Sequence, residues 1–447
     1  MSTALAVVTA QSATQVYASG FALIENSASG QGEAFAGAAA VASDASTIWF
    51  NPAGMMHLGD DQMVVVGHYI KPKSEFTNVN STTAAAVGGA PLTGPADDGG
   101  STAVTGNFYI VKTLDKNAKF GFGFTTPFGL ATQYNDNWIG RYHSVVTDLK
   151  TYNFNPSIAF NFNDKLSVGA GINLLLANVK FTNVVDFGSL CYAAIGASAC
   201  TYKGIAPQGA DGFADLSADN YSDLAWGINF GLLYKLSPDT RLGLAYRSRV
   251  TINVTGRANF TVPGSMSFLT SGGQFVNTGL KASVTLPDSL SLSLASDHDK
   301  WTWLADATWT GWSSFNELRI SYDNPLQPDS VTTENWKNTM RYSAGANYKY
   351  SDAILLRAGW AYDETPVPNA EHRTARVPGN SRRWISLGVG YKMKKDMNLD
   401  VGYSHLFISD TPINNTFESG VPTLAATLNG TYQASVDILS AQLVWKY

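Results

Sequence analysis

The chain has 447 residues, of which 12% are aromatic and only 15% are charged, against about 25% charged residues in a typical soluble chain. The net charge of -5 and the absence of any Lys/Arg cluster exclude a nucleic-acid partner. No apolar run of about 18 residues follows the N-terminus, which excludes a transmembrane helix, so low charge, many aromatics and many glycines favour a transmembrane β-barrel.

Residues 1–18 are typical of a secretory signal peptide. The stretch "ALAVVTA" is a short apolar run, and Val16 and Ala18 are small residues at the usual spacing for cleavage before Ser19. The basic residues that normally precede the apolar run are missing, which indicates a truncated or misassigned start. An ordinary disordered start is the alternative.

Residues 19–62 precede the first predicted strand and show no strand period. In "STIWFNPAGMMHLGDDQ", Trp49 and Phe50 run into Asn51-Pro52-Ala53, where proline forbids a continuing helix or a central strand and Asn can bond backbone groups in the bend. A barrel of the size predicted below leaves a lumen unless something fills it. We therefore predict a plug inside the barrel, in which Phe35, Trp49 and Phe50 seal the lumen or contact its ligand.

Residues 63–447 alternate between apolar and polar positions with the period of β-strands. Every second residue from Leu224 to Leu236, for example, is apolar. The last strand carries Trp445 and Tyr447 on one face, and a terminal aromatic residue is typical of outer-membrane barrels. The pattern predicts fourteen strands, which lie near 63–72, 104–113, 118–126, 150–162, 165–180, 222–236, 240–255, 287–298, 300–312, 338–350, 353–362, 382–394, 397–408 and 434–447.

The connections between these strands alternate in length. Short turns lie near 114–117, 163–164, 237–239, 299, 351–352 and 395–396, and long segments lie near 73–103, 127–149, 181–221, 256–286, 313–337, 363–381 and 409–433. A soluble β-sandwich has no reason to place every long connection at one end. An outer-membrane barrel has short periplasmic turns and long external loops, so we predict a 14-stranded antiparallel barrel over residues 63–447, in the bacterial outer membrane.

The two cysteines, Cys191 and Cys200, lie close together in one of the long segments. In an exported protein such a pair predicts a disulfide within the loop, and two free thiols are the alternative. Two cysteines without nearby histidines are too few ligands for a metal.

No catalytic constellation is visible in the sequence. The six histidines are scattered: His57, His68, His143, His298, His372 and His405. They form no i, i+4 metal pair, and none is paired in sequence with a serine nucleophile. We expect no enzymatic activity, no cofactor and no metal. The alternatives are an outer-membrane phospholipase or protease built across strands, and a general diffusion porin with a charged lumen.

Several stretches resemble the FadL family of outer-membrane transporters for long-chain fatty acids and other hydrophobic compounds. "SGFALIENSASGQGEAFAGAAAVASDASTIWFNPAGM" is similar to the N-terminal hatch of that family, and Asn51-Pro52-Ala53 matches its hatch motif. Further similar stretches are "RLGLAYRSRV", "TLPDSLSLSLA", "TWTGWSSFNEL", "RAGWAYDETPVP" and "RVPGNSRRWISLGVGY". Together they cover nearly the whole chain.

The resemblance implies a 14-stranded barrel closed by an N-terminal hatch, here residues 19–62. In that family, external loops capture a hydrophobic substrate, hatch movement opens a route, and a kink in the third strand releases the substrate sideways into the membrane. In this sequence Pro127-Phe128-Gly129 interrupts the third strand, and the interruption is either the end of the strand or that lateral gap. Asn51 and Pro52 would fix the bend that gates the lumen. We expect a monomer in contact with outer-membrane lipid.

The class of hydrophobic substrate depends on whether a cation faces it. A carboxylate in an apolar pocket needs a cationic partner, because burying it alone is costly. Lys180, Arg319 and Lys337 flank long loops and are candidates, although each can equally be a solvated loop charge. A transporter of aromatic hydrocarbons would need none of them.

Overall fold

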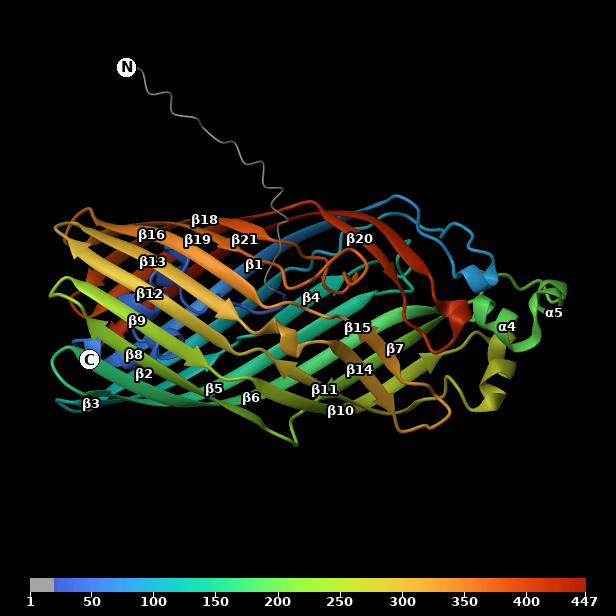
Figure 1. Ribbon diagram of the computed structural model, residues 1–447, viewed down its shortest axis with the longest axis horizontal. Coiled ribbons are helices and arrows are strands. Elements are labelled where there is room, and N and C mark those ends of the chain that lie inside the picture. Colours follow the sequence, from blue (N-terminus) through green and yellow to red (C-terminus); the bar gives the residue numbers. More distant parts are fainter. Residues whose placement is uncertain (1–19) are drawn as a thin grey trace, which may run out of the picture.

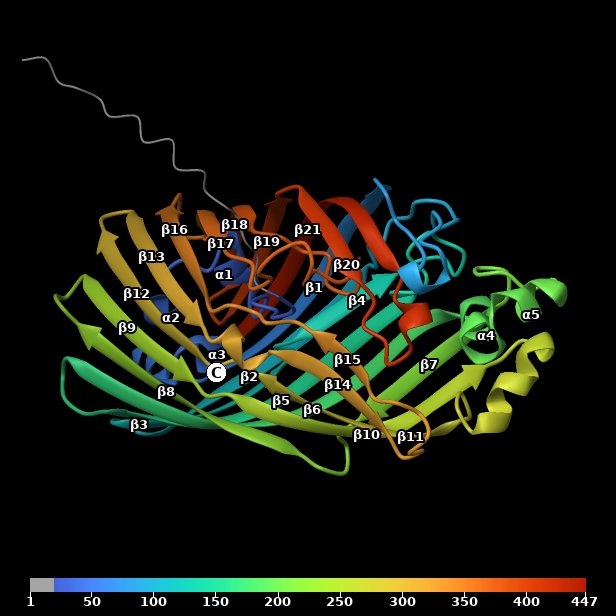
Figure 2. The same ribbon diagram turned by 45° about the vertical axis from the view of Figure 1, so that its right-hand side comes forward.

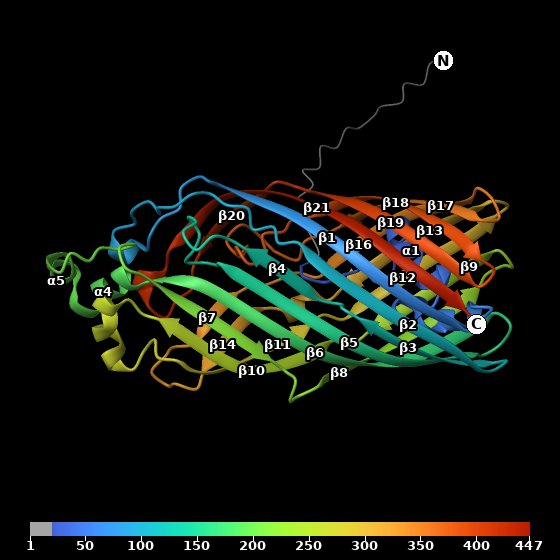
Figure 3. The same ribbon diagram turned by 180° about the vertical axis from the view of Figure 1, so that it is seen from behind.

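A computed structural model describes residues 20–447 as a single closed β-barrel with the N-terminal segment inside it (Figure 1). The barrel closes where β1 (Gln62–Asn78) pairs along its whole length with β21 (Thr427–Lys446), while its other edge pairs with β2 (Ala103–Asp115). Figure 3 shows these three strands side by side. The predicted signal peptide and its cleavage site before Ser19 lie outside the described residues.

The predicted number of fourteen barrel strands is confirmed, although seven of them are interrupted once, so that twenty-one segments form the sheet. Besides β1, β2 and β21, the uninterrupted strands are β5 (Val146–Asn161), β6 (Leu166–Asp186), β17 (Ile354–Asp363) and β18 (Arg382–Lys394). The interrupted strands are β3 (Ala118–Thr125) with β4 (Gly129–Gln133), β7 (Asp211–Asp219) with β8 (Ala225–Lys235), β9 (Thr240–Arg247) with β10 (Val250–Thr261), β11 (Thr278–Leu286) with β12 (Ser289–His298), β13 (Trp301–Thr310) with β14 (Glu317–Tyr322), β15 (Ser330–Thr333) with β16 (Thr339–Lys349), and β19 (Met397–Ile408) with β20 (Thr411–Thr416).

The interruptions divide this wall into two tiers of opposite polarity. We call the part built from β8, β9, β12, β13 and β16 the membrane tier, and the part built from β7, β10, β11, β14 and β15 the outer tier (Figure 2). In the membrane tier, Leu292 of β12 points outward and is exposed, whereas its neighbour Ser293 points inward and is buried. In the outer tier, Leu280 of β11 is buried inside, whereas Lys281 is exposed. The membrane tier is therefore apolar outside, and the outer tier is apolar inside.

This inversion explains why the predicted strands were too short at their outer ends. Segments β7, β11, β14, β15 and β20, together with β4, lie in regions that the alternation assigned to long connections. Along one barrel strand the apolar residues move from the outward to the inward face, although they keep the even-numbered places in the sequence, as from Leu280 to Leu294 across β11 and β12. The irregular residues that turn the strand over, here Pro287 and Asp288, read as the end of a strand, so the outer half was assigned to a connection.

The N-terminal residues before β1 fill the lumen of the membrane tier, as the blue segment in Figures 1 and 2 shows. This hatch contains α1 (Ala28–Gly32), α2 (Ala38–Val41), α3 (Thr47–Phe50) and the 3-10 helix η1 (Pro52–His57). It approaches the wall very closely. A Cβ atom added at Gly243 of β9 would lie 2.0 Å from the carbonyl oxygen of Ala39, so a strand glycine is needed there.

The outer end of the barrel is covered by loops and short helices (Figure 3). These helices are η2 (Ala85–Val87), α4 (Phe187–Ile195), α5 (Ala197–Tyr202), η3 (Gly264–Gly272) and η5 (Pro422–Leu424), whereas η4 (Trp312–Ser314) joins β13 to β14 where the tiers meet. A disulfide between Cys191 and Cys200 joins α4 to α5. Within residues 20–447, no helix has both the length and the apolar character needed to cross a membrane.

Candidate functional site

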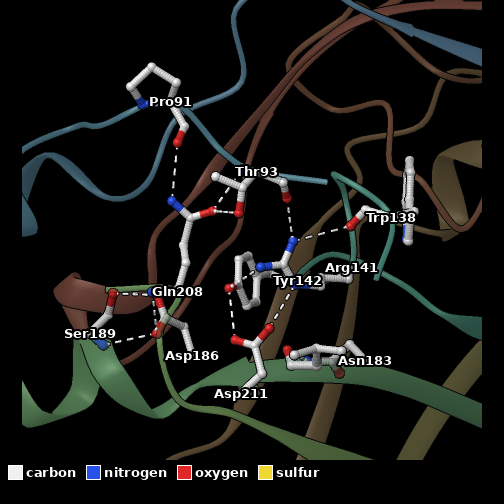
Figure 4. Close-up of polar contacts among 11 residues, drawn as sticks. Pro91, Thr93, Trp138, Arg141, Tyr142, Asn183, Asp186, Ser189, Gln208 and Asp211 are labelled. Carbon is white, nitrogen blue, oxygen red and sulfur yellow. Dashed lines mark hydrogen bonds and ion pairs between the residues drawn. The ribbon is translucent and has the colours of Figure 1, made fainter. Parts of the chain in front are cut away.

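An outer cavity lies between the external loops. Its lining includes Tyr142, His143, Asp186, Tyr322, Glu334 and Arg376, which come from five different connections and strands. The loops around it are tied together by polar contacts, which Figure 4 shows. Arg141 forms an ion pair of 2.8 Å with Asp211 and donates to the carbonyl oxygen of Thr93, whose N–H in turn donates to the side chain of Gln208. The network fixes three loops against one another and so holds the mouth of the cavity in shape.

A second cavity, the inner pocket, lies below the outer cavity inside the outer tier. Its wall is almost entirely apolar and includes Leu216, Ile252, Val254, Leu280, Val284 and Ile320. These are the inward residues of β7, β10, β11 and β14, so the inverted polarity of the outer tier is what makes the pocket. The inner pocket is suited to an aliphatic or aromatic group and offers little to a polar solute.

Two charged residues, Glu334 and Arg376, line both the outer cavity and the inner pocket and therefore mark their junction. Arg376 lies over the ring of Phe181 and makes contacts of 3.1 to 3.3 Å from one guanidinium nitrogen to Ser144, Val146 and Thr147. Burial lowers the pKa of Arg376 to about 10, so the guanidinium stays charged at neutral pH. It presents a cation to whatever passes between the two cavities.

The carboxyl group of Glu334 is buried at the same junction. It accepts a hydrogen bond of 2.7 Å from the indole of Trp336, and only 4% of the residue is exposed. Burial raises the pKa of Glu334 to about 8, because the charged form loses its hydration. At neutral pH this side chain is therefore mostly uncharged, and Arg376 is not neutralised by it.

An aromatic cluster forms the floor of the inner pocket. Phe21, near the start of the hatch, packs edge-on against Trp312, Phe315 and Phe128 with ring centroids 5.0, 5.7 and 6.0 Å away, and against Trp336 at 5.6 Å. Phe21 is buried and lines the inner pocket, whereas the next residues of the hatch line a third cavity. The ring of Phe21 therefore separates the two spaces.

The third cavity, which we call the hatch pocket, lies between the hatch and the wall of the membrane tier. Its lining includes Phe35, Trp49 and Phe50 of the hatch, together with Pro127 and Phe128 of the wall and Arg247 of β9. The hatch aromatics predicted to seal the lumen are thus placed at this cavity. Phe35 is fully buried against Phe50 and Trp384, while Trp49 lies under the guanidinium of Arg247.

The motif Asn51-Pro52-Ala53 anchors the hatch to the wall. The Asn51 amide donates to the carbonyl oxygens of Ala39 in the hatch at 2.7 Å and Leu232 in β8 at 2.9 Å. Its side-chain oxygen accepts from the N–H of Ala53 at 3.0 Å, which caps η1, and Pro52 occupies the first position of that helix. One asparagine therefore holds two hatch segments and a strand together.

The wall is interrupted at Pro127-Phe128-Gly129, between β3 and β4. Both segments pair with β5, but three residues of this strand stand opposite two of β5, so the interruption is a one-residue bulge and not the end of the strand. On the other side, the β2–β3 ladder stops at Phe108 and Phe124. Beyond these residues β2 no longer pairs with this strand, and the hatch pairs with its free edge instead. The backbone N–H of Leu23 donates to the carbonyl of Pro127, and the N–H of Gly129 donates to the carbonyl of Phe21.

The cations predicted as carboxylate partners are not brought to the cavities. Lys180 forms an ion pair with Asp215 on the outside of the barrel, and Arg319 is exposed and paired with Glu317 and Asp329. Lys337 lines none of the three cavities. The arginine that lines both the outer cavity and the inner pocket is Arg376, the first residue of the stretch "RVPGNSRRW". The feature of the sequence that could have identified this cation is its place between two apolar residues, Ala375 and Val377, in a long loop.

Among residues 20–447, no group of three His, Cys, Asp or Glu side chains is arranged to hold a metal ion. The buried charges instead line cavities or bond the hatch. The arrangement can bind an apolar body, orient an anionic group and block a lumen.

Comparison with known proteins gives a consistent result. A family model described as outer membrane protein transport protein (OMPP1/FadL/TodX) matches residues 9–447. The long-chain fatty acid transport protein of Escherichia coli K12 is 31% identical over 92% of this chain and 93% of its own length. Outer membrane protein P1 of Haemophilus influenzae is 28% identical over 96% and 95%.

Solved structures show the same fold. A Pseudomonas aeruginosa FadL homologue superposes with a TM-score of 0.85 at 23% identity, covering 96% of this chain and 100% of the other. The Pseudomonas putida toluene transporter TodX superposes with a TM-score of 0.68 at 17% identity, covering 97% and 100%. At these identities the likeness speaks for the fold alone.

Proposed function

Because this chain belongs to the OMPP1/FadL/TodX family of outer membrane transport proteins, we propose that it carries long-chain fatty acids, or closely similar amphiphiles, across the bacterial outer membrane. The observation that carries this proposal is the junction of the two upper cavities. There the apolar inner pocket ends at the charged guanidinium of Arg376. A long apolar body with one anionic end fits that arrangement.

The two parts of such a ligand are bound by different forces. Each Å² of tail surface buried among residues such as Val254 and Val284 contributes roughly 25 cal/mol. The carboxylate would be costly to bury alone, and Arg376 compensates that cost with a charge-assisted hydrogen bond. Glu334 is mostly protonated at neutral pH and can donate a second hydrogen bond without repelling the ligand.

The same residues suggest a route. The external loops capture the amphiphile in the outer cavity, and its tail enters the inner pocket down to Phe21. Further entry requires the ring of Phe21 to move. Because the backbone at Phe21 and Leu23 holds the edge of the bulge, displacement of this segment also frees the gap between β2 and β4. The ligand then passes the hatch pocket and leaves sideways into the membrane.

The hatch keeps the lumen closed to polar solutes in this scheme. It is bonded to the wall by Asn51, by Gln31 to the carbonyl of Ile438 and by Gln442 to the N–H of Ala28. A general diffusion porin needs an open lumen, so this filling argues against that alternative. Nothing in the route requires catalysis, and we expect the protein to act as a monomer.

Uptake of aromatic hydrocarbons is the second candidate function. Phe21 and Phe315 line the inner pocket, backed by Trp312 and Trp336, and would pack well against a small ring compound. A neutral ring compound needs no cationic partner, so the effect of substituting Arg376 distinguishes the two candidate functions.

The test compares oleate with toluene as ligands of the purified protein. We expect Arg376→Gln to weaken oleate binding by about tenfold or more, the effect of losing one charge-assisted hydrogen bond, and to leave toluene binding unchanged. Arg319→Gln, which changes an exposed and paired arginine, is the matched control and should alter neither. Mass spectrometry of lipids that copurify with the protein should find monocarboxylates. Tight toluene binding with no measurable oleate binding would overturn the fatty-acid proposal.

A further inference from the structure

Arg247, the last residue of β9, holds one corner of the hatch. A guanidinium nitrogen of Arg247 donates to the carbonyl oxygen of Trp49 at 2.7 Å, and the group lies 3.6 Å from the centre of the Trp49 ring. It also donates to the side-chain oxygen of Asn173 in β6. A single arginine of the wall thus fixes both the backbone and the ring at the end of α3.

Arg247 differs from two other lumen arginines that contact the hatch, Arg241 and Arg357, and resembles Arg341, which donates to the carbonyl oxygen of Ala34. Arg241 donates to the carbonyl of Ala40 but is also paired with Asp297 at 2.9 Å, and Arg357 is paired with Asp400 at 2.8 Å. In the part of the chain that the structure describes, Arg247 has no carboxylate partner, since its acceptors are a carbonyl and an amide oxygen. A guanidinium sheltered from water without a counter-charge is costly, and an incoming anion would relieve that cost.

The hatch pocket gives an anion access to this group. Arg247 lines the pocket beside Asn229, whose residue is 2% exposed and whose amide nitrogen has no hydrogen-bond partner. An orphaned donor at such depth is a second place for an anionic oxygen to bind. Pro127 and Phe128 of the wall interruption line the same pocket.

We propose that Arg247 is an anion-operated latch: a carboxylate that reaches the hatch pocket replaces the Trp49 carbonyl as the acceptor on Arg247 and so releases that corner of the hatch. A carboxylate can accept two parallel hydrogen bonds from the guanidinium and neutralises its charge, whereas the Trp49 carbonyl accepts one bond and leaves the charge uncompensated, so the exchange is favourable. This inference rests on the proposed function and makes it more specific. Neutral hydrophobic compounds bind in the upper cavities but do not release the latch.

The latch also sets a limit on what the ligand can do. A ligand shifts the hatch only by the difference between its affinities for the latched and released states. The carboxylate supplies that difference at Arg247, whereas the tail contributes about equally to both states. The head group therefore acts twice, first at Arg376 while the tail occupies the inner pocket, and then at Arg247 once the ligand has passed Phe21 into the hatch pocket.

The experiment measures how often the Trp49 corner opens. Ser46 lies one turn before Trp49, is 5% exposed, and makes no capping hydrogen bond with its side chain. The thiol introduced by Ser46→Cys is nearly isosteric, and both natural cysteines are held in a disulfide. The labelling rate of this thiol by a maleimide is recorded in the purified protein with no ligand, with saturating oleate, and with saturating oleyl alcohol.

We expect oleate to raise the labelling rate about tenfold, the effect of one charge-assisted hydrogen bond, and oleyl alcohol to leave it near the resting value. In the Arg247→Gln background the resting rate should already be high and oleate should add nothing. Arg247→Lys keeps the positive charge but loses the planar guanidinium, which can donate to two acceptors at once. This variant should give an intermediate labelling rate without ligand. Arg241→Gln is the matched control, because it also removes a bond to a hatch carbonyl. It should preserve the difference between oleate and oleyl alcohol.

Two results would overturn the latch. One is an equal rise with oleate and oleyl alcohol, and the other is an oleate-specific rise that persists in both Arg247 variants. Oleate binding is titrated in the same samples. If oleate does not bind at all, the proposed function fails; if oleate binds normally and the labelling rate does not respond, only the latch fails.

Discussion

The membrane tier and the outer tier of the barrel are made from the same strands, yet their polarity is reversed. The membrane tier is apolar on its outer face, and the outer tier is apolar on its inner face. In the membrane tier the inward positions carry groups such as Ser293 and Asn229, which face a hatch held by hydrogen bonds. In the outer tier the inward positions carry Val254 and Leu280, which face an apolar pocket. The difference teaches that the sealing part of the molecule relies on directional polar contacts, whereas the binding part relies on apolar area.

The two tiers meet where the wall is least regular. Most of the interrupted strands break at this level, and the bulge at Pro127-Phe128-Gly129 is one of these breaks. A strand that changes the direction in which its apolar residues point must pass through a zone where neither phase holds. The lateral gap proposed for substrate release lies in that zone. The reversal of polarity between the tiers therefore also accounts for the position of the proposed exit.

The largest expected effect comes from closing the junction between the tiers. Deleting Pro127 removes the extra residue of the bulge, so that β3 and β4 can pair continuously with β5 in their present registers. We expect a folded barrel that still binds oleate but whose uptake by cells lacking another fatty acid transporter falls to background. Pro127→Ala keeps the extra residue and should transport at a nearly normal rate. Normal uptake by the deletion variant would remove the lateral route from the account.

The next largest effect comes from changing the polarity of the outer tier. Val254 of β10 is 6% exposed and lines the inner pocket, while the neighbouring Asn253 points outward and is exposed. Val254→Asp places a carboxylate among apolar groups, and we expect oleate affinity to fall by at least about 100-fold, because burying an uncompensated charge is costly. Asn253→Asp should leave the affinity unchanged. Equal effects of the two substitutions in a binding titration would contradict the proposed pocket.

The sequence predicted the strands of the membrane tier more completely than those of the outer tier. The alternation of the membrane tier gave all fourteen strands, because its outward residues, such as Leu290 and Leu292, follow one phase over many residues. The outer segments were missed because irregular residues such as Pro287 and Asp288, between β11 and β12, read as the end of a strand, although the apolar residues keep one phase in the sequence. Periodicity shows that residues share a face, but it does not show which face encloses the ligand.

The candidate site was predicted only in part for a related reason. The hatch aromatics were identified because Trp49 and Phe50 precede a proline in a segment without strand period. Arg376 and Arg247, the ligand contacts that we propose, were not singled out, because a charge in a loop or on the polar face of a strand is usually solvated. Their importance depends on which distant residues surround them, such as Phe181 for Arg376 and Trp49 for Arg247. Sequence spacing does not carry that information.

A smaller effect is expected from loosening the membrane tier. Asn51→Ala together with Pro52→Ala removes three hydrogen bonds of the Asn51 side chain, each contributing about 1 kcal/mol, and the fixed bend. We expect more frequent opening events in single-channel recordings and impaired ligand-driven uptake, with oleate binding retained. Ser43→Ala, at an exposed hatch position, is the control. If the double variant stays sealed and transports at the normal rate, residues 46–62 are a passive plug.

The smallest expected effect is a pH dependence that belongs to the outer tier. The pKa of Glu334 is raised by burial from 4.5 to about 8. Its stabilising contribution is therefore complete below pH 4.5 and is lost as the pH rises through about 8. Above that pH the ionised group also repels a bound carboxylate and competes for Arg376, so oleate affinity should fall several-fold. Glu334→Gln should remove this dependence, and an unchanged profile in the variant would exclude Glu334 as its source.

The central claim is that one amphiphile is bound with its tail inside the outer tier and its head group at the junction of the cavities. A structure of the protein with a stearic acid brominated in mid-chain tests it most directly, because the bromine atoms locate the tail independently of the density for the carbon chain. The account predicts bromine positions among Val254, Leu280 and Val284, with the carboxylate within hydrogen-bond distance of Arg376. Bromine on the outer surface of the barrel, or a carboxylate bound at Lys180, Arg319 or Lys337 instead, would contradict it.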